Sequence, residues 1–437
     1  MNLDLLFQKA KQKGIEDVQA FLSHKNELSI EVFNGDLDKY EISDSSSLIV
    51  RGIYQGKFGT FVTEVMDDSI IDLIIDNMIA NAKIIDSPDE AIIYAGDKKY
   101  EIVEGLFEEA LEKKDAAEKI AAVKELDGLL HKADPRVSIA ETMYSETTRT
   151  VLLQNTKGLK LYNKVNSAYL GAQVIVKDET DQRTGFDLDI TNDFADFNLS
   201  ELADRIVKEG IDALGAKPIA SNNYEIILRR DALAILLATF QNVFSADAVQ
   251  KGLSLLKGKL SETIGSELVT IVDDPFLKKS SSSRSFDDEG CATKYKELIK
   301  NGVLTTYLHN LNTAKKDGLS TTGNGFSGSV SFINMKMISG NDTMEAMLAS
   351  IKDGLLITNL QGSHAGANTV SGDFSLQASG FVIKDGKIGA PVALVTVAGN
   401  FISLLKDIVA VGDDSKTSFY GVTCPSVKVK SMPVSGL

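Results

Sequence analysis

Apolar and polar residues alternate along most of the first 65 positions, after a short amphipathic helix. Residues 3–10 place Leu3, Leu6, Phe7 and Ala10 on one helical face. Turn-forming pairs then separate the alternating runs, at Asn34-Gly35, Asp44-Ser45 and Gln55-Gly56. These runs lie at residues 18–23, 28–34, 37–43, 47–54 and 57–63. The pattern predicts an antiparallel meander, and an apolar period close to 3.6 predicts a helix at residues 67–83.

The same order of elements recurs between residues 114 and 214. A helix is predicted at residues 114–132 and another at 199–214. Strand-like runs lie between them, at residues 137–144, 147–155, 158–168, 169–176 and 184–190. We interpret this as a weak internal repeat, because spacing supports it and residue identity does not. A coincidence of topology remains the alternative.

The pattern changes after Lys217-Pro218. Residues 224–228 predict a buried strand, and Asp231 is the expected N-cap of a helix at 232–244. Glycine becomes frequent in residues 320–328 and 362–380, among short β-rich runs. The expected class is therefore α+β, with helix-flanked antiparallel meanders followed by a glycine-rich, mostly-β domain with a few helices. The expected domains are residues 1–95, 96–218 and 219–437.

Composition excludes several classes of protein. The 437-residue chain carries a net charge of −15, whereas a nucleic-acid-binding protein needs a basic surface. No apolar run approaches the roughly 20 residues of a membrane span, and the N-terminus lacks the pattern of a signal peptide. Two cysteines, neither in a CxxC pair, give no disulfide framework and no structural zinc motif. We expect a cytoplasmic protein.

Residues 285–310 concentrate the residue types that carry chemistry. Asn301-Gly302 between strand-like runs predicts a type I′ hairpin whose lysines largely face solvent, and Asp385-Gly386 predicts a second hairpin of the same kind. Before the hairpin, "DDEG" could hold a metal or move protons, or could be a turn whose carboxylates cap backbone N–H groups. Cys291 could be a nucleophile, but no cysteine-protease signature surrounds it, and a buried inert thiol is the favoured interpretation.

Four histidines are present, and none forms a zinc-binding helix motif. They are His24, His131, His309 and His364, and none is followed by glutamate. HExxH and HExxxH are therefore absent from the sequence. His364 lies in the glycine-rich loop "GSHAGANTVSGD" and is expected to be the most exposed. This loop and "GLSTTGNGFSGS" are expected to line a groove in which an extended peptide pairs with a sheet edge.

Four segments together resemble the TldD/PmbA family. They are "FDDEGCATKYKELIKNGVLTTYLHN", "STTGNG", "SGDFSLQASGFVIKDGKIGAPV" and "VAGNFISLLKDIVAVGDD". The resemblance covers essentially the whole chain and is densest between Asp287 and Asp414. It implies metallopeptidases that act on unfolded or leader peptides, built from TldD-type subunits with zinc and PmbA-type (TldE) subunits without it. The family name also records a link to modulation of DNA gyrase.

The resemblance assigns this chain to the PmbA/TldE type. The two histidines and the glutamate of a TldD-type HExxxH helix would fall at Ala238, Val243 and Thr239. The distal zinc-binding cysteine would fall near Val411 and Gly412, about a dozen residues before Cys424. None of these positions offers a ligand, so we expect no catalytic residue and no metal in this chain, and zinc in a TldD-type partner.

Three functional interpretations follow. The favoured one is a zinc-free subunit that pairs with a TldD-type protease, with pairing of the chain with itself also open. In that case Asp288, Glu289, Asn324 and His364 are at most contacts to substrate or partner. The second is a self-sufficient peptidase that uses Cys291, or a metal held by Asp287, Asp288, Glu289 and His309. The third is a peptide-binding gyrase modulator with no proteolytic role.

Overall fold

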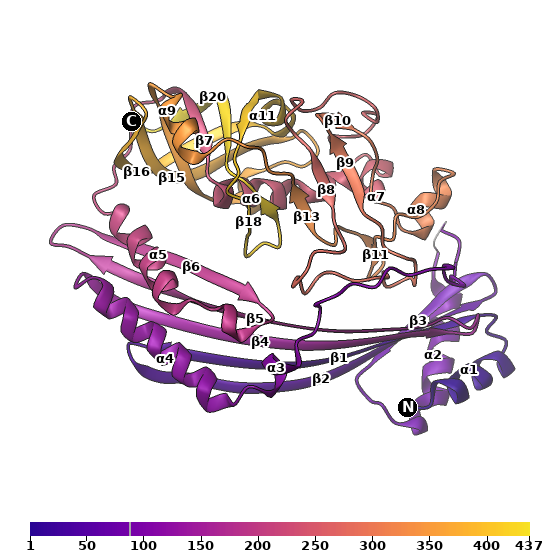
Figure 1. The fold of residues 1–437 in the computed structure, drawn as a ribbon. Coiled ribbons are helices and arrows are strands. Elements are labelled where there is room, and N and C mark those ends of the chain that lie inside the picture. The colour runs from indigo at the N-terminus through magenta and orange to yellow at the C-terminus, as the bar shows by residue number, and fades with distance from the viewer. Residues whose placement is uncertain (87–88) are drawn as a thin grey trace.

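The computed structural model describes residues 1–86 and 89–437 and shows an α+β protein in two layers (Figure 1). The first part of the chain forms one long, curved antiparallel sheet with helices on one face. The C-terminal part lies over the opposite face. Within the described residues, no helix is long and apolar enough to span a bilayer.

The N-terminal sheet has six strands in the order β3-β2-β1-β4-β5-β6. The strands are β1 (Val18–Phe33), β2 (Asp36–Tyr54), β3 (Lys57–Thr63), β4 (Val137–Asn155), β5 (Lys160–Lys177) and β6 (Gln182–Thr191). Its helices are α1 (Leu3–Gln12), α2 (Ile71–Ile84), α3 (Glu109–Lys113), α4 (Ala116–Ala133) and α5 (Leu199–Asp212), with 3-10 turns η1 (Asp68–Ile70) and η2 (Phe194–Asp196). All neighbouring strands are antiparallel, as the meander pattern predicts.

The expected internal repeat is present as topology. Each half runs helix, three-stranded meander, helix, and the halves meet where β1 pairs with β4. On the helix-covered face of the sheet, alternate residues of β1 take part in two separate apolar cores. Val18 and Ala20 pack with α1 and α2, whereas Ile30 and Val32 pack with α4 and α5. The two halves therefore share one sheet.

The expected breaks inside the long strands were wrong. Residues 18–33 form one strand rather than two, and the turn expected at Asp44-Ser45 is absent. Asp44 pairs with Asn26 and Ser45 with Lys25, so the ladder to β1 continues through these residues. Pairing along the whole length of β1 overrides a weak local turn preference. The turn at Asn34-Gly35 is confirmed, with φ of 47° and 90°.

The C-terminal part contains two further six-stranded sheets and a short hairpin. One sheet has the order β16-β15-β14-β7-β20-β17, and the other β10-β9-β8-β13-β19-β18. The first comprises β7 (Asn222–Leu228), β14 (Asp353–Gln361), β15 (Asp373–Lys384), β16 (Lys387–Asn400), β17 (Ile408–Val411) and β20 (Val427–Ser435). The second comprises β8 (Ile271–Asp273), β9 (Lys296–Lys300), β10 (Val303–Leu304), β13 (Met335–Met337), β18 (Lys416–Thr417) and β19 (Thr423–Cys424). The hairpin is β11 (Gly325–Phe326) with β12 (Ser329–Val330).

Short helices connect these strands. They are α6 (Arg230–Phe240), α7 (Ala246–Gln250), α8 (Leu311–Lys316), α9 (Met344–Ala349), α10 (Ser363–Gly366) and α11 (Phe401–Asp407), with a 3-10 turn η3 (Gln241–Phe244) after α6. One large apolar core contains side chains from α6 and from both sheets. The predicted hairpin turns at Asn301-Gly302 and Asp385-Gly386 are confirmed by their positive φ values.

Candidate functional site

The acidic turn, Asp287–Cys291, lies where the C-terminal part meets the long sheet. Gln19 of β1 and Arg51 of β2 both donate to the carbonyl oxygen of Asp288, at 3.1 and 3.2 Å. The hydroxyl of Tyr100 donates to the carbonyl of Gly290 at 2.7 Å. Phe286, just before the turn, packs against apolar side chains of β1 and β4. The turn therefore fastens the two layers together.

Backbone N–H groups saturate the carboxylate of Asp287. Its Oδ1 accepts from the N–H groups of Glu289 and Cys291 at 3.0 and 2.9 Å, and its Oδ2 accepts from Gly325 at 2.9 Å. The side chain is fully buried. Burial and the nearby charge of Glu289 raise the pKa of Asp287 to about 7, against the three N–H groups that favour the charged form. The predicted capping turn is confirmed here.

Asp288 and Glu289 are also held by internal donors. The Oδ2 of Asp288 accepts from the N–H of Ser327 at 3.0 Å, and its Oδ1 pairs with Arg284 at 3.3 Å. The Oε2 of Glu289 accepts from the N–H of Leu311 at 2.8 Å. A Cβ on Gly325 would lie 2.5 Å from that same oxygen, so a larger residue there would force the Glu289 carboxylate to move.

Asp287, Glu289 and Cys291 also form the one group of described side chains whose candidate ligand atoms come within 4.8 Å of one another. A metal would have to displace the backbone N–H groups that already bind Asp287, and those groups would repel a cation. Burial, with Asp287 and Glu289 nearby, raises the pKa of the Cys291 thiol, which opposes the thiolate that zinc requires. The cluster fits a hydrogen-bonded turn and does not fit a zinc site.

Of the other candidates, Asn324 and His309 lie near the acidic turn, where Thr322 Oγ1 bonds to Asn324 Oδ1 and to the His309 carbonyl. Asn324 is fully buried, and its amide donates to Asp273 Oδ2 and to the carbonyl of Ser331 at 2.7 and 2.9 Å. His309 is buried, which lowers its pKa, and it lies outside the acidic cluster. His364 is exposed on α10, as expected of that loop.

One lysine of the predicted hairpin departs from the expected solvent face. Lys296 is buried and pairs with the fully buried Asp273 at 3.0 Å. Asp273 also accepts the Asn324 amide and the N–H groups of Ile333 and Asn334. The expectation for Lys296 was wrong because alternation shows which residues share a face but does not identify the neighbouring strand, here β8, that places Asp273 opposite Lys296.

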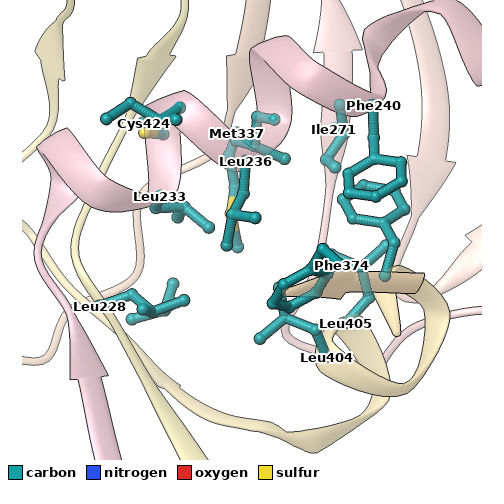
Figure 2. Close-up of a cluster of buried hydrophobic side chains, with 14 of the residues drawn as sticks. Leu228, Leu233, Leu236, Phe240, Ile271, Met337, Phe374, Leu404, Leu405 and Cys424 are labelled. Carbon is teal, nitrogen blue, oxygen red and sulfur yellow. The ribbon is translucent and has the colours of Figure 1, made fainter. Parts of the chain in front are cut away.

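The helix that would hold a TldD-type zinc motif is α6, and it is packed into the core (Figure 2). Val243, just after α6, is fully buried, and Ala238 packs against the same core. The hydroxyl of Thr239 donates to the carbonyl of Ile235 at 2.6 Å. Figure 2 shows Leu233, Leu236 and Phe240 among the buried apolar side chains around this helix. The aligned positions offer no zinc ligand.

The start of α6 differs from the expected one. Arg229, not Asp231, is the N-cap of α6, and Asp231 lies in its first turn, where it pairs with Arg229 at 2.6 Å. The expected cap was wrong because the helix begins two residues earlier. Cys424 lies beside the start of α6 and donates to the carbonyl of Arg230 at 3.3 Å, and burial raises its pKa.

Sequence reasoning missed the residues that hold the acidic turn from the other layer. Gln19, Arg51 and Tyr100 are separated from it by roughly 190 to 270 positions. Asp97 belongs to the same group, since its Oδ2 accepts from the N–H of Ala292 at 2.7 Å. No local pattern marks these residues, because the contact depends on how the C-terminal part lies on the sheet.

Three family profiles match successive parts of the chain. The PmbA/TldA metallopeptidase domain 1 matches residues 18–82, the central domain matches 109–214 and the C-terminal domain matches 221–436. A PmbA metalloprotease homologue from Buchnera aphidicola subsp. Baizongia pistaciae is 28% identical over 310 residues, 70% of this chain and 67% of the relative. PmbA from Escherichia coli O157:H7 is 27% identical over 61% of this chain and 58% of the relative.

Solved structures extend the similarity to almost the whole chain. A Thermotoga maritima protein, whose name links it to modulation of a DNA gyrase, has a TM-score of 0.93 and 35% identity, with 99% of both chains covered. TldE from Thermococcus kodakarensis shares the fold, with a TM-score of 0.88 at 22% identity over 99% of this chain and all of that one. A TldD homologue from Buchnera aphidicola is 25% identical over 72% of each chain. With all three domain profiles matched in order, the chain belongs to the PmbA/TldD metallopeptidase family.

Proposed function

We propose that this chain is a zinc-free subunit of a TldD/TldE-type metallopeptidase, which contributes peptide binding and assembly rather than bond cleavage. The observation that carries the proposal is the chemistry of α6 and the residues after it. Ala238, Thr239 and Val243 occupy the positions that would hold two histidines and a glutamate in a TldD-type subunit. A methyl group, a hydroxyl bonded to its own helix and a buried isopropyl group cannot bind zinc.

Zinc-dependent peptide hydrolysis needs about three protein ligands, an open coordination position and a general base. When bound in a partner, zinc would activate the water that attacks the peptide. In this chain the acidic turn is committed to holding two layers together, and Cys291 is buried with a raised pKa. Neither the acidic turn nor the Cys291 thiol is therefore available to activate water or to attack a peptide in place of zinc.

A TldD-type subunit is the partner that the proposal requires. The family contains chains named TldD and TldE, and this chain is similar to both. In the assembly, the partner would provide the zinc and the general base, while this chain would provide part of the surface that holds an extended peptide.

The test is reconstitution with a TldD-type subunit from the same genome and an unfolded peptide as substrate. We expect cleavage by the complex and none by this chain alone. Cys291→Ala and His309→Ala should leave the activity of the complex within about twofold of wild type, since neither group touches substrate. A His→Ala change in the partner's HExxxH motif is the matched control and should abolish cleavage.

Two results would contradict the proposal. Cleavage by this chain alone would support the self-sufficient peptidase, and loss of that activity in Cys291→Ala would assign the nucleophile. Failure of the two chains to associate when co-expressed would remove the subunit role.

A further inference from the structure

A hollow of about 340 Å³ lies over the middle of the long sheet, on the face that carries Gln19 and Arg51. Its lining includes Ser23 and Lys25 of β1, Ser45 and Ser47 of β2, and Arg149 of β4. Glu64, just past β3, also lines it and is exposed, so the hollow contains one carboxylate beside its two cations. The volume falls within the range of small-ligand pockets, which is about 300–1,000 Å³.

Two cations lie side by side in the lining of this hollow. Lys25 and Arg149 are direct cross-strand partners in the β1–β4 ladder, a position in which like charges repel. Lys25 is compensated by Glu27 at 2.5 Å. Arg149 donates its Nε to the hydroxyl of Ser23 at 3.2 Å and forms no ion pair with any described residue. In a chain of net charge −15, Arg149 is therefore a cation without a carboxylate partner among the described residues, and its guanidinium can accept a charged hydrogen-bonding partner.

A third cation adds to this field. Arg284 stands next to the acidic turn, and burial together with the charge of Arg149 lowers its pKa, against the opposing effect of Asp288. The hydroxyls of Ser23, Ser45 and Ser47 add neutral donors that suit a carboxylate.

The hollow lies beside an open edge of the sheet. β3 pairs with β2 only from Leu48 onward, so residues 36–47 of β2 have β1 as their sole strand partner among the described residues. In the other half of the sheet, β5 likewise extends beyond β6, but there Asn166 bonds with the backbone of Leu106 and Glu108. The free edge of β5 is therefore covered at Asn166, whereas the corresponding edge of β2, residues 36–47, has no strand partner besides β1 among the described residues.

We propose that this hollow binds a carboxylate of an extended peptide whose backbone pairs with residues 36–47 of β2. Arg149 would make the charged contact, Lys25 would add to the field, and the serines would donate hydrogen bonds. β-Strand addition supplies backbone affinity, and the basic hollow selects an anionic group. The inference rests on the proposed peptide-binding function and gives it a substrate class.

The carboxylate can be the C-terminus of the peptide or an acidic side chain, and four probes separate these sources. Each is a fluorescein-labelled, unstructured decapeptide measured by fluorescence anisotropy against the full chain without a partner. The four combine a single Glu or Gln at mid-length with a free or amidated C-terminus. We expect removal of the recognised carboxylate to weaken binding about tenfold or more, because one charged hydrogen-bonded contact is lost.

Arg149→Gln should produce the same weakening for the preferred probe and should abolish the difference between probes. The matched control is Arg136→Gln, which changes the same charge at an exposed site in the turn just before β4, about 40 Å away along the direction of that strand. This control should leave unchanged both the affinity for the preferred peptide and the difference in affinity between the four peptides. If Arg149→Gln does not fold, Lys25→Gln serves instead, because Lys25 is half-exposed, and a smaller loss of preference is expected.

Three outcomes would overturn the inference. They are equal affinity for all four probes, unchanged binding in both pocket variants, and a concentration-dependent dimer that Arg149→Gln dissociates, which would assign the edge to a second copy of the chain. None of them bears on the zinc-free subunit role, which is decided by metal content and reconstituted cleavage. The two proposals therefore fail separately.

Discussion

The acidic turn and the basic hollow touch the same sheet and differ in how their charges are satisfied. Every carboxylate oxygen of Asp287 accepts an internal N–H, and the turn's own carbonyls accept from Gln19, Arg51 and Tyr100. Arg149, by contrast, has only a serine hydroxyl as partner among the described residues. The carboxylate of Asp287 therefore has its hydrogen-bonding capacity used within the protein, whereas the Arg149 guanidinium has further N–H groups that the proposed carboxylate contact would use.

The largest expected effect is that of Asp287→Ala. This change leaves three buried backbone N–H groups without an acceptor and loosens the junction between the layers. We expect a loss of about 3–5 kcal/mol in the free energy of unfolding, measured by urea denaturation. Asp288→Ala, at a less buried carboxylate with two partners, is the comparison and should cost less. Equal stability of Asp287→Ala and wild type would show that the turn is not framework.

The pH dependence of stability should carry the signature of Asp287. Its pKa is raised to about 7 in the folded chain, above its ordinary range, so the folded state binds the extra proton between about pH 4 and 7. Its contribution to stability is therefore largest at low pH, falls by at most about 1.4 kcal/mol per pH unit through this window and is constant above it. The difference in unfolding free energy between wild type and Asp287→Asn, followed from pH 5 to 9, isolates it. A difference that rises with pH would contradict this assignment.

Tyr100→Phe should have an intermediate effect. It removes the hydroxyl that donates to the Gly290 carbonyl and accepts from the N–H of Asp97, with little change in shape. We expect a loss of about 1–2 kcal/mol in the free energy of unfolding. Tyr162→Phe, at an exposed tyrosine of the same sheet, is the matched control and should be neutral. Equal effects of the two changes would argue against a specific junction.

The smallest effect on stability is expected for Arg149→Gln. Removing a cation that faces Lys25 relieves repulsion while losing one bond to Ser23, so the free energy of unfolding should stay within about 0.5 kcal/mol of wild type. Thermal unfolding at low and moderate salt measures it. A large destabilisation would make Arg149 a framework residue like Asp287 and would remove the contrast between the two regions.

Local signals predicted the parts of the fold that depend on local geometry. Asn34-Gly35, Asn301-Gly302 and Asp385-Gly386 form the turns their sequences require, and the carboxylates of "DDEG" cap backbone N–H groups. The strand breaks failed because long-range pairing carried β1 and β2 through weak turn signals. Lys296 was misplaced because its partner, Asp273, comes from another strand.

The candidate sites divide in the same way. The absence of zinc ligands at Ala238, Thr239 and Val243 could be read directly from the sequence, since it depends on residue type. The basic hollow could not, because Lys25 and Arg149 become neighbours only through a ladder between strands separated by more than 100 residues. Whether a cation has a carboxylate partner depends on the residues that the fold brings near it, and the sequence around Arg149 does not show these residues.

The central claim is that this chain carries no catalytic zinc, and metal analysis tests it most directly. The chain should be purified alone and as a complex with a TldD-type subunit, both without chelators, and zinc measured by mass spectrometry against protein concentration. We predict about one zinc per complex, lost when the partner's HExxxH histidines are replaced, and none in the chain alone. Stoichiometric zinc in the chain alone, removed by Asp287→Ala or Cys291→Ala, would contradict the account and make the acidic turn a metal site.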